Sequence, residues 1–285
     1  MSAVRIFESH AKSILVRSNL PGCDFVINPY TGCAFACAYC YASFMSQYVG
    51  ETLESWGSFV FVKTNAVELL EAKLSHMRPA SMEASIFFSS VTDPYQGVET
   101  RYRLTRGCLE ALAEQRWSGP VTILTKSPLV LRDLDVLARL ADVEVGLTVT
   151  TTADATGRLI EKAAPAASRR IETLAALHAA GIATYAFVGP LMPHYADRPE
   201  RLDALFGALS LAGVREVFVE HLNAAPYIGA RLWPMLRAAN SAAPDYFAGF
   251  ADPAAAARLD ALVGELLARH GLSIRGGGII HHGSA

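Results

Sequence analysis

Three cysteines, Cys33, Cys37 and Cys40, lie within eight residues of a 285-residue chain that contains only five cysteines. Their spacing is Cys-x3-Cys-x2-Cys, in the segment NPYTGCAFACAYCYAS at residues 28–43. Clustered thiols hold zinc, which normally takes four ligands, or an iron–sulfur cluster, which also takes four. Three thiolates on a [4Fe–4S] cluster leave one iron open, which suits the binding of a substrate or cofactor. The odd number of cysteines fits poorly with a disulfide framework.

The two remaining cysteines, Cys23 and Cys108, leave alternatives open. Cys23 lies ten residues before Cys33 and would complete a four-ligand site. A zinc-binding domain without catalytic activity and an iron–sulfur electron-transfer protein, each with Cys23 as the fourth ligand, are therefore alternatives to a catalytic cluster. Cys108 occurs in RLTRGCLEAL, where a helix should face the core, and is interpreted as a small buried hydrophobe.

The composition favours a globular cytoplasmic protein. Hydrophobic residues make up 52% of the chain, which is enough for an extensive core. The formal net charge of −2 provides no overall field to attract polyanions, and it weighs against tight nucleic-acid binding. Residues 1–18 lack the continuous apolar region of a signal peptide, and no apolar run reaches the roughly 18 residues that cross a bilayer.

Six short β-branched runs alternate with helical patterns, and these elements must position the cysteines. Buried parallel strands are typically continuous apolar runs. The runs occupy residues 25–28, 84–91, 121–126, 143–150, 182–189 and 216–222. Between them, Asn65 with Glu68 predicts a capped helix start, and two helices are expected to end at Gly181 and Gly213. A further helix is expected around residues 254–270.

Six strand–helix repeats fit either a barrel or a doubly wound sheet. Both architectures place functional residues at the carboxyl ends of the strands. Polar residues and glycine gather at these ends, namely Thr92, Asp93, Lys126, Thr148, Gly189 and His221. His221 ends the sixth run and is our first candidate for a catalytic substrate contact. Further candidates for substrate contact are Tyr95, Gln96, His194 and Tyr195.

The predicted elements suggest a division of the chain into three segments. We expect an N-terminal segment over residues 1–24 and a barrel over residues 25–225. Residues 226–285 are rich in alanine and glycine, and we expect them to form a C-terminal extension packed on the barrel.

The pattern Cys33-x3-Cys37-x-Tyr39-Cys40 after a first strand resembles the signature loop of radical S-adenosylmethionine (SAM) enzymes. The resemblance implies an α/β fold, a partial (β/α)6 TIM-like barrel of the radical SAM type with a C-terminal helical extension. It also implies a [4Fe–4S] cluster on the three cysteines, with SAM bound at the open iron. SAM is then cleaved to a 5′-deoxyadenosyl radical that abstracts hydrogen from a substrate. In this family the position of Tyr39 lies near the adenine.

Five motifs in order resemble the spore photoproduct lyase-related group, often labelled DNA repair photolyases. They are NPYTGCxxxCxYCYA, VKTN at 62–65, SVTDPYQ at 90–96, ILTKS at 123–127 and AGIATYAFVGPLMP at 180–193. The resemblance implies SAM contacts at Thr92, Asp93, Lys126 and either Thr148 or Thr150, with Gly189 near the nucleoside. Tyr41 matches a tyrosine that relays hydrogen near the cluster.

One departure from this group bears on the substrate. The lyase has a cysteine that returns hydrogen to the product radical, and Ser90 occupies that position here. A hydroxyl O–H bond is far too strong to donate hydrogen as a thiol does. We therefore expect a radical SAM enzyme of the lyase or oxidoreductase class with an unidentified substrate, and the net charge does not support nucleic acid. An electron donor such as flavodoxin or ferredoxin is expected, and no membrane association.

Overall fold

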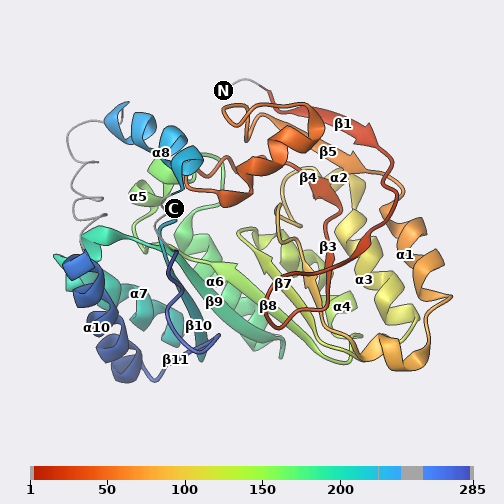
Figure 1. Ribbon diagram of the computed structural model, residues 1–285. Coiled ribbons are helices and arrows are strands. Elements are labelled where there is room, and N and C mark those ends of the chain that lie inside the picture. Colours follow the sequence, from red (N-terminus) through yellow and green to blue (C-terminus); the bar gives the residue numbers. More distant parts are fainter. Residues whose placement is uncertain (1–2, 224, 239–252, 283–285) are drawn as a thin grey trace. The chain divides into compact units, whose positions relative to one another are not determined.

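The computed structural model describes residues 3–223, 225–238 and 253–282 (Figure 1). The chain forms two compact units. Unit 1 comprises Met1–Phe35, Ala42–Gly146 and Ala179–Ala183, whereas unit 2 comprises Ala36–Tyr41, Leu147–His178 and Thr184–Ala285. Cys33 therefore belongs to unit 1, while Cys37 and Cys40 belong to unit 2.

Unit 1 contains the first strands of the mainly parallel sheet. Strand β2 (Leu15–Arg17) pairs antiparallel with β3 (Phe25–Ile27), which runs parallel to β6 (Ile86–Phe88). Strand β6 is in turn parallel to β7 (Val121–Thr125), and β8 (Val143–Thr148) begins beside β7. Strands β3, β6 and β7 of this sheet each contribute a fully buried aliphatic or aromatic side chain, namely Ile27, Phe88 and Ile123.

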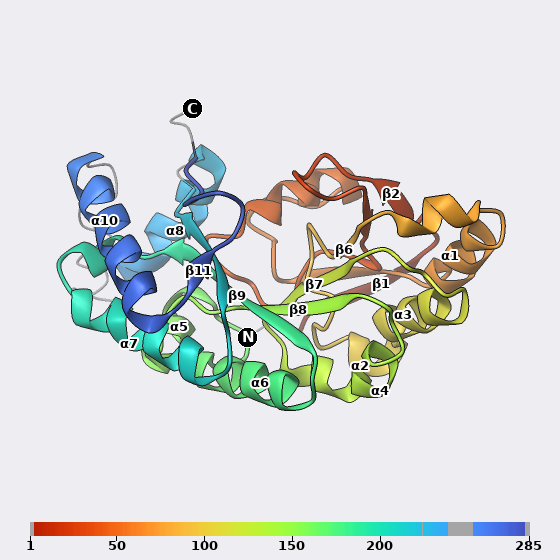
Figure 2. The same cartoon turned by 90° about the horizontal axis from the view of Figure 1, so that it is seen from below.

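A second, three-stranded sheet in unit 1 carries the chain into the cysteine loop. Strand β5 (Phe59–Lys63) lies between parallel β1 (Arg5–Ser9) and antiparallel β4 (Tyr30–Thr31). Helices α1 (Ala66–Leu74) and α3 (Leu104–Glu114) pack against each other in this unit (Figures 1 and 2). The shorter helical segments are α2 (Glu99–Tyr102), α4 (Leu134–Leu137) and the 3-10 turns Pro79–Glu83 and Pro128–Asp133. A further 3-10 segment, Tyr41–Val49, belongs to unit 1 except for its first residue, Tyr41, which belongs to unit 2.

Unit 2 continues the alternation of strands and helices. Strand β10 (Glu216–His221) runs parallel to both β9 (Ala183–Leu191) and β11 (Ser273–Ile274). The residue after β8 is fixed beside β9 by a hydrogen bond from Val149 N to Phe187 O of 2.9 Å. The helices are α5 (Asp154–Ile160), α6 (Ala167–Ala179), α7 (Pro199–Leu211), α8 (Pro226–Ala238) and α10 (Pro253–His270), with a 3-10 turn at Pro193–Ala196. Helices α7 and α10 lie side by side (Figure 1).

The predicted fold class is confirmed. Each of the six predicted runs contains a strand, in the predicted order, and the pairs β3–β6, β6–β7 and β9–β10 are parallel. Helices α6 and α7 end just before Gly181 and Gly213, which both adopt a positive φ. Helix α10 covers the predicted helix at 254–270. The predicted boundaries at residues 24 and 225 stay a prediction. None of the helices among the described residues is long and apolar enough to cross a membrane.

The helix start predicted at Asn65 is confirmed, because Asn65 is the N-cap residue of α1, but its side chain does not form the predicted cap. Within the described residues, the Asn65 side chain makes no hydrogen bond to the first turn of α1. Its amide instead accepts a hydrogen bond from Ala11 N (2.9 Å) and donates one to Ala11 O (3.0 Å). The local pattern could not reveal this, because the partner lies more than fifty residues away in sequence.

Candidate functional site

In unit 1, side chains that follow β6 fix the backbone on both sides of Cys33. The carbonyl oxygen of Gly32 accepts hydrogen bonds from Thr92 Oγ1 (2.6 Å) and Gln96 Nε2 (3.1 Å). Ala34 N donates to Gln96 Oε1 (2.9 Å), and the Gln96 side chain is fully buried. Thr92 and Gln96 also hydrogen-bond each other at 3.0 Å. The loop around Cys33 is therefore held by buried hydrogen bonds rather than by solvent contacts.

Gly32 supplies a conformation that this loop requires. Its φ is +89°, and a Cβ at this position would lie 2.6 Å from the carbonyl oxygen of Phe59 and 2.9 Å from its ring. We expect Gly32→Ala to lower the free energy of unfolding by about 3 kcal/mol, because backbone strain and overpacking add. Urea denaturation measures this change.

Gly22→Ala is the matched control for this prediction. Gly22 has a φ of +70°, but apart from its own atoms and those of its two chain neighbours no heavy atom of the described residues lies within 4 Å of a Cβ built there. Gly22→Ala should therefore lower the free energy of unfolding only by the backbone strain of a left-handed alanine, about 1 kcal/mol. Equal losses in the two variants would contradict the close approach of strand β5 to the loop.

In unit 2, the second half of the cysteine loop is fixed by two other segments. Cys37 forms an antiparallel bridge with Glu161, and Ala38 N donates to Ile160 O at 2.8 Å. From α8, the Arg231 guanidinium donates to the carbonyl oxygen of Cys37 at 3.2 Å and approaches that of Cys40 at 3.5 Å. These contacts therefore fix the backbone of the second half of the loop.

Tyr39 belongs to a buried polar network within unit 2. Its hydroxyl donates to one oxygen of Glu161, and the Arg170 guanidinium forms an ion pair with the other. The Glu161 and Arg170 side chains are each 1% exposed. Arg170 also donates to Pro165 O (2.9 Å) and Thr148 O (3.1 Å). The network therefore joins the cysteine loop to the end of β8.

The titration of this network follows from its burial. Burial, followed by the nearby Glu161 charge, raises the pKa of Tyr39 well above its ordinary value. Burial alone would lower the pKa of Arg170, but the Glu161 carboxylate raises it overall. The hydroxyl of Tyr39 thus remains a donor, which fixes the orientation of its ring.

Asp93 links the carboxyl ends of strands β6 and β7, where the sequence predicted that polar residues gather. Its carboxylate accepts hydrogen bonds from Tyr95 N (2.9 Å), Thr125 Oγ1 (2.7 Å) and Lys126 N (2.9 Å). Burial raises the pKa of Asp93 despite these hydrogen bonds. The Lys126 side chain is half-buried. Asp93 thereby fixes the backbone from which Lys126 projects.

The ends of β8 and β9 carry the other predicted cofactor contacts. Thr148 is buried, and its carbonyl oxygen is taken by Arg170. The hydroxyl of Thr150 is buried without a hydrogen-bond partner among the described residues, which favours Thr150 over Thr148 as a donor to a ligand. A Cβ on Gly189 would lie 2.2 Å from the Phe187 ring and 3.0 Å from the Glu220 carboxylate. A side chain at position 189 would therefore collide with both.

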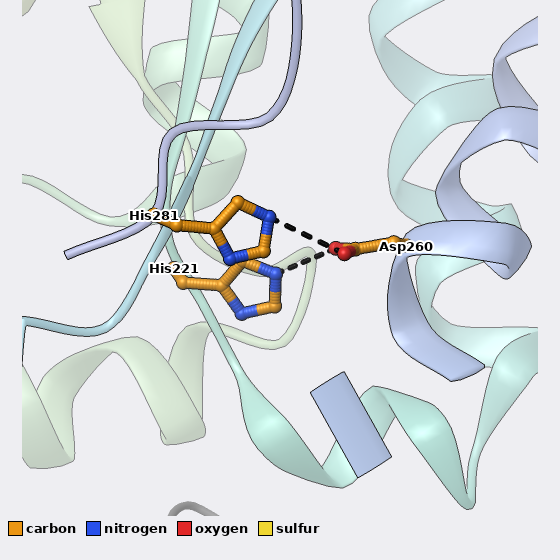
Figure 3. Close-up of side chains that lie close together, drawn as sticks. All are labelled: His221, Asp260 and His281. Carbon is orange, nitrogen blue, oxygen red and sulfur yellow. Dashed lines mark hydrogen bonds and ion pairs between the residues drawn. The ribbon is translucent and has the colours of Figure 1, made fainter. Parts of the chain in front are cut away.

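The two predicted catalytic residues differ in their surroundings. The Tyr41 side chain is 44% exposed, and its carbonyl oxygen accepts a hydrogen bond from the Tyr227 hydroxyl at 3.2 Å. Partial desolvation, followed by Cys40 and Glu220, raises the pKa of Tyr41. His221 lies in a cluster with Asp260 and His281 (Figure 3).

The structure thus places the predicted site residues in two groups. Unit 1 holds Cys33, Thr92, Asp93 and Lys126, whereas unit 2 holds Cys37, Tyr39, Cys40, Tyr41, Thr148, Gly189 and His221. Sequence reasoning missed the supporting residues Glu161, Arg170 and Arg231. It also took Gln96 as a substrate contact, although the Gln96 amide binds the chain's own loop. The other suggested substrate contacts, Tyr95, His194 and Tyr195, have buried side chains.

A set of parallel β/α repeats with a three-cysteine loop at a strand end defines the radical SAM class of proteins. The family model for the Radical SAM superfamily matches residues 27–205. An uncharacterized protein of Methanocaldococcus jannaschii is 36% identical over 196 residues, which cover 69% of this chain and 71% of that protein. An uncharacterized protein of Mycobacterium bovis is 33% identical over 203 residues, which cover 70% of this chain but only 58% of the relative. The chain belongs to the Radical SAM superfamily.

Solved structures agree on the fold. Spore photoproduct lyase complexed with dinucleoside spore photoproduct superimposes with a TM-score of 0.67 and 15% identity, over 94% of this chain and 81% of the lyase. SuiB of Streptococcus suis bound to its precursor peptide SuiA gives a TM-score of 0.53 and 14% identity, over 88% of this chain and 48% of SuiB. The two proteins bind different kinds of substrate, so the shared fold leaves the substrate of this chain undecided.

The residues of this chain fit the groups that the superfamily implies. All five cysteines are among the described residues, and none of them forms a disulfide. Three thiols closely spaced in the sequence are suited to hold three irons of a [4Fe–4S] cluster, which leaves the fourth iron for another ligand. The buried hydroxyl of Thr150 offers a polar group for a bound ligand.

Proposed function

We propose that the chain binds a [4Fe–4S] cluster through Cys33, Cys37 and Cys40 and binds SAM at the open iron. The observation that carries this proposal is the backbone fixation of the cysteine loop by Gln96 in unit 1 and by Arg231 in unit 2. Such fixation holds the backbone on which the three cysteines lie. When bound, the cluster and SAM supply a 5′-deoxyadenosyl radical for hydrogen abstraction.

The chain's own residues divide into those that contact SAM and those that position the contacts. We propose that Lys126 pairs with the SAM carboxylate and that Tyr39 lies against the adenine. The Thr92 hydroxyl donates to Gly32 and the Asp93 carboxylate accepts from three donors, so both act by positioning. Thr150 donates to the ligand, with Thr148 as the neighbouring alternative. We propose that the backbone at Gly189 lies near the SAM nucleoside, while Phe187 and Glu220 fill the space that a side chain at this position would need.

The substrate differs from spore photoproduct in our proposal. The hydroxyl of Ser90 accepts a hydrogen bond from Asn28 Nδ2 at 3.2 Å, which gives this side chain a structural role. A serine at this position does not donate a hydrogen atom to a product radical. We propose that the exposed Tyr41 beside Cys40 performs the hydrogen relay instead, in a lyase or oxidoreductase reaction. The reductant is proposed to be a small flavodoxin- or ferredoxin-type carrier.

The test is an anaerobic reconstitution of the cluster followed by reduction with dithionite. We expect the electron paramagnetic resonance spectrum of the reduced cluster to change when SAM is added, because SAM chelates the open iron. We also expect release of 5′-deoxyadenosine. A fully loaded sample that shows neither result contradicts the proposal.

Cysteine variants separate the proposal from its alternatives. Cys37→Ala should lose the cluster, whereas Cys23→Ala should keep both the cluster and the response to SAM. The thiol of Cys23 already donates to its own chain, at the carbonyl oxygen of Phe25 (3.0 Å). A zinc protein or an electron-transfer protein with Cys23 as fourth ligand would instead lose its metal in Cys23→Ala.

A further inference from the structure

Three side chains from separate elements of unit 2 meet outside the cysteine loop. His221 ends β10, Asp260 lies on α10, and His281 lies in the segment that follows β11 (Figure 3). One carboxylate oxygen of Asp260 lies 2.7 Å from His221 Nε2, and the other lies 3.3 Å from His281 Nε2. The two imidazole rings stack with their centres 4.4 Å apart. The two Nε2 atoms therefore converge on one carboxylate.

The backbone fixes this arrangement. His221 N donates to Ile280 O (2.9 Å), and Ile280 N donates to Val219 O (2.8 Å). The segment at Ile280 therefore runs parallel to the end of β10, with Ile280 opposite Glu220. This register places His281 beside His221. The next histidine, His282, makes a different contact, with Glu220 at 3.0 Å.

We propose that His221, Asp260 and His281 bind a divalent transition-metal ion of the zinc type. Two imidazole nitrogens and one carboxylate oxygen form a common donor set of open zinc sites. Ligand atoms bound to one tetrahedral zinc ion lie about 3.4 Å apart, since each bond is about 2.1 Å long. The observed separations of 2.7 and 3.3 Å are both shorter than this value, and all three ligand atoms lie within 4.8 Å of one another, so a bound ion needs only a small spreading of the side chains.

The exposure of the three side chains fits such a site. His221 is 15% exposed, Asp260 33% and His281 53%, so one side of the cluster is open to water. Water completes the coordination of an ion held by three protein ligands. The ion would join β10, α10 and the segment after β11. His221 is then a metal ligand rather than the catalytic substrate contact that its strand-end position suggests.

The test measures zinc bound to the full chain whose cluster has been reconstituted anaerobically, so that the three loop thiols are occupied. After equilibration with micromolar zinc and removal of loose metal, we expect one zinc ion per chain. Asp260→Asn and His281→Gln should retain none. The control His282→Gln should retain one, because His282 lies beside the site without contributing a ligand. Retention by the first two variants, or no zinc in the unaltered chain, overturns the proposal.

Cobalt substitution distinguishes this site from metal captured by the cysteines. Cobalt bound at the cluster of His221, Asp260 and His281 should give absorption bands of nitrogen and oxygen ligation without thiolate charge-transfer bands. A variant with Cys33, Cys37 and Cys40 all changed to alanine should still bind one cobalt ion. This result is independent of the proposed radical chemistry. Thiolate bands, or loss of binding in the triple variant, overturn the proposal.

Discussion

Arg170→Met is expected to destabilise the fold by about 3–5 kcal/mol, since the substitution leaves Glu161 buried without its charge partner. The guanidinium is the group that compensates this carboxylate, and it also satisfies the carbonyl oxygens of Pro165 and Thr148. Methionine fills part of the volume but supplies no donor. The change in free energy of unfolding from urea denaturation measures the effect.

The same variant should also load less cluster. The backbone of Glu161 forms a β-bridge with Cys37, and its carboxylate accepts a hydrogen bond from the Tyr39 hydroxyl. A Glu161 without its charge partner is therefore expected to loosen the cysteine loop at both contacts. We expect a lower iron and sulfide content per chain after reconstitution. Full loading despite large destabilisation would show that the network supports the fold but not the loop.

Two controls isolate the role of the buried charge. Arg169→Met removes an exposed ion pair with Glu172 and should change stability by less than about 1 kcal/mol. The double variant Arg170→Met with Glu161→Gln removes both charges and should recover part of the loss. A double variant as unstable as Arg170→Met alone would assign the loss to packing or to the carbonyl contacts instead.

The elements that sequence alone predicted are those with a strong local signal. The buried parallel strands β3, β6, β7, β8, β9 and β10 appear in the sequence as continuous apolar runs, because both faces of such strands are covered. The three cysteines could be recognised as a group from their Cys-x3-Cys-x2-Cys spacing. Strand β1 has four exposed residues and one half-buried residue, so it lacks such a run and its pairing with β5 was not predicted.

The supporting residues could not be predicted because their partners are distant in sequence. Arg170 directly follows Arg169 in the sequence, yet the Arg170 side chain is buried and the Arg169 side chain is exposed. Its partner Glu161 contacts Tyr39, which is more than a hundred residues away. The cluster around His221 likewise needs Asp260 and His281, which no local pattern connects. The sequence predicted which polar residues lie at the carboxyl ends of the strands, but it did not predict the hydrogen bonds that these residues make.

Lys126→Ala is expected to weaken SAM binding about 10- to 100-fold, since a charged hydrogen bond contributes about 1.5–3 kcal/mol. Cluster loading should stay unchanged, because the Lys126 backbone amide keeps its hydrogen bond to Asp93. Equilibrium binding of SAM to the reconstituted protein measures the affinity, and iron content measures the loading. Loss of the cluster in this variant would contradict a direct contact with SAM.

Asp93→Asn distinguishes a positioning residue from a contact. The Asp93 carboxylate accepts three hydrogen bonds at the ends of β6 and β7. In Asp93→Asn an amide NH2 group replaces one carboxylate oxygen, and this group cannot accept the hydrogen bonds made to that oxygen. We therefore expect Asp93→Asn to lower both the stability of the fold and the affinity for SAM, whereas Lys126→Ala lowers only the affinity. If Asp93→Asn left stability unchanged and weakened SAM binding alone, Asp93 would be a ligand contact and the turn would not depend on it. The pair of variants therefore assigns each residue its role through two independent measurements.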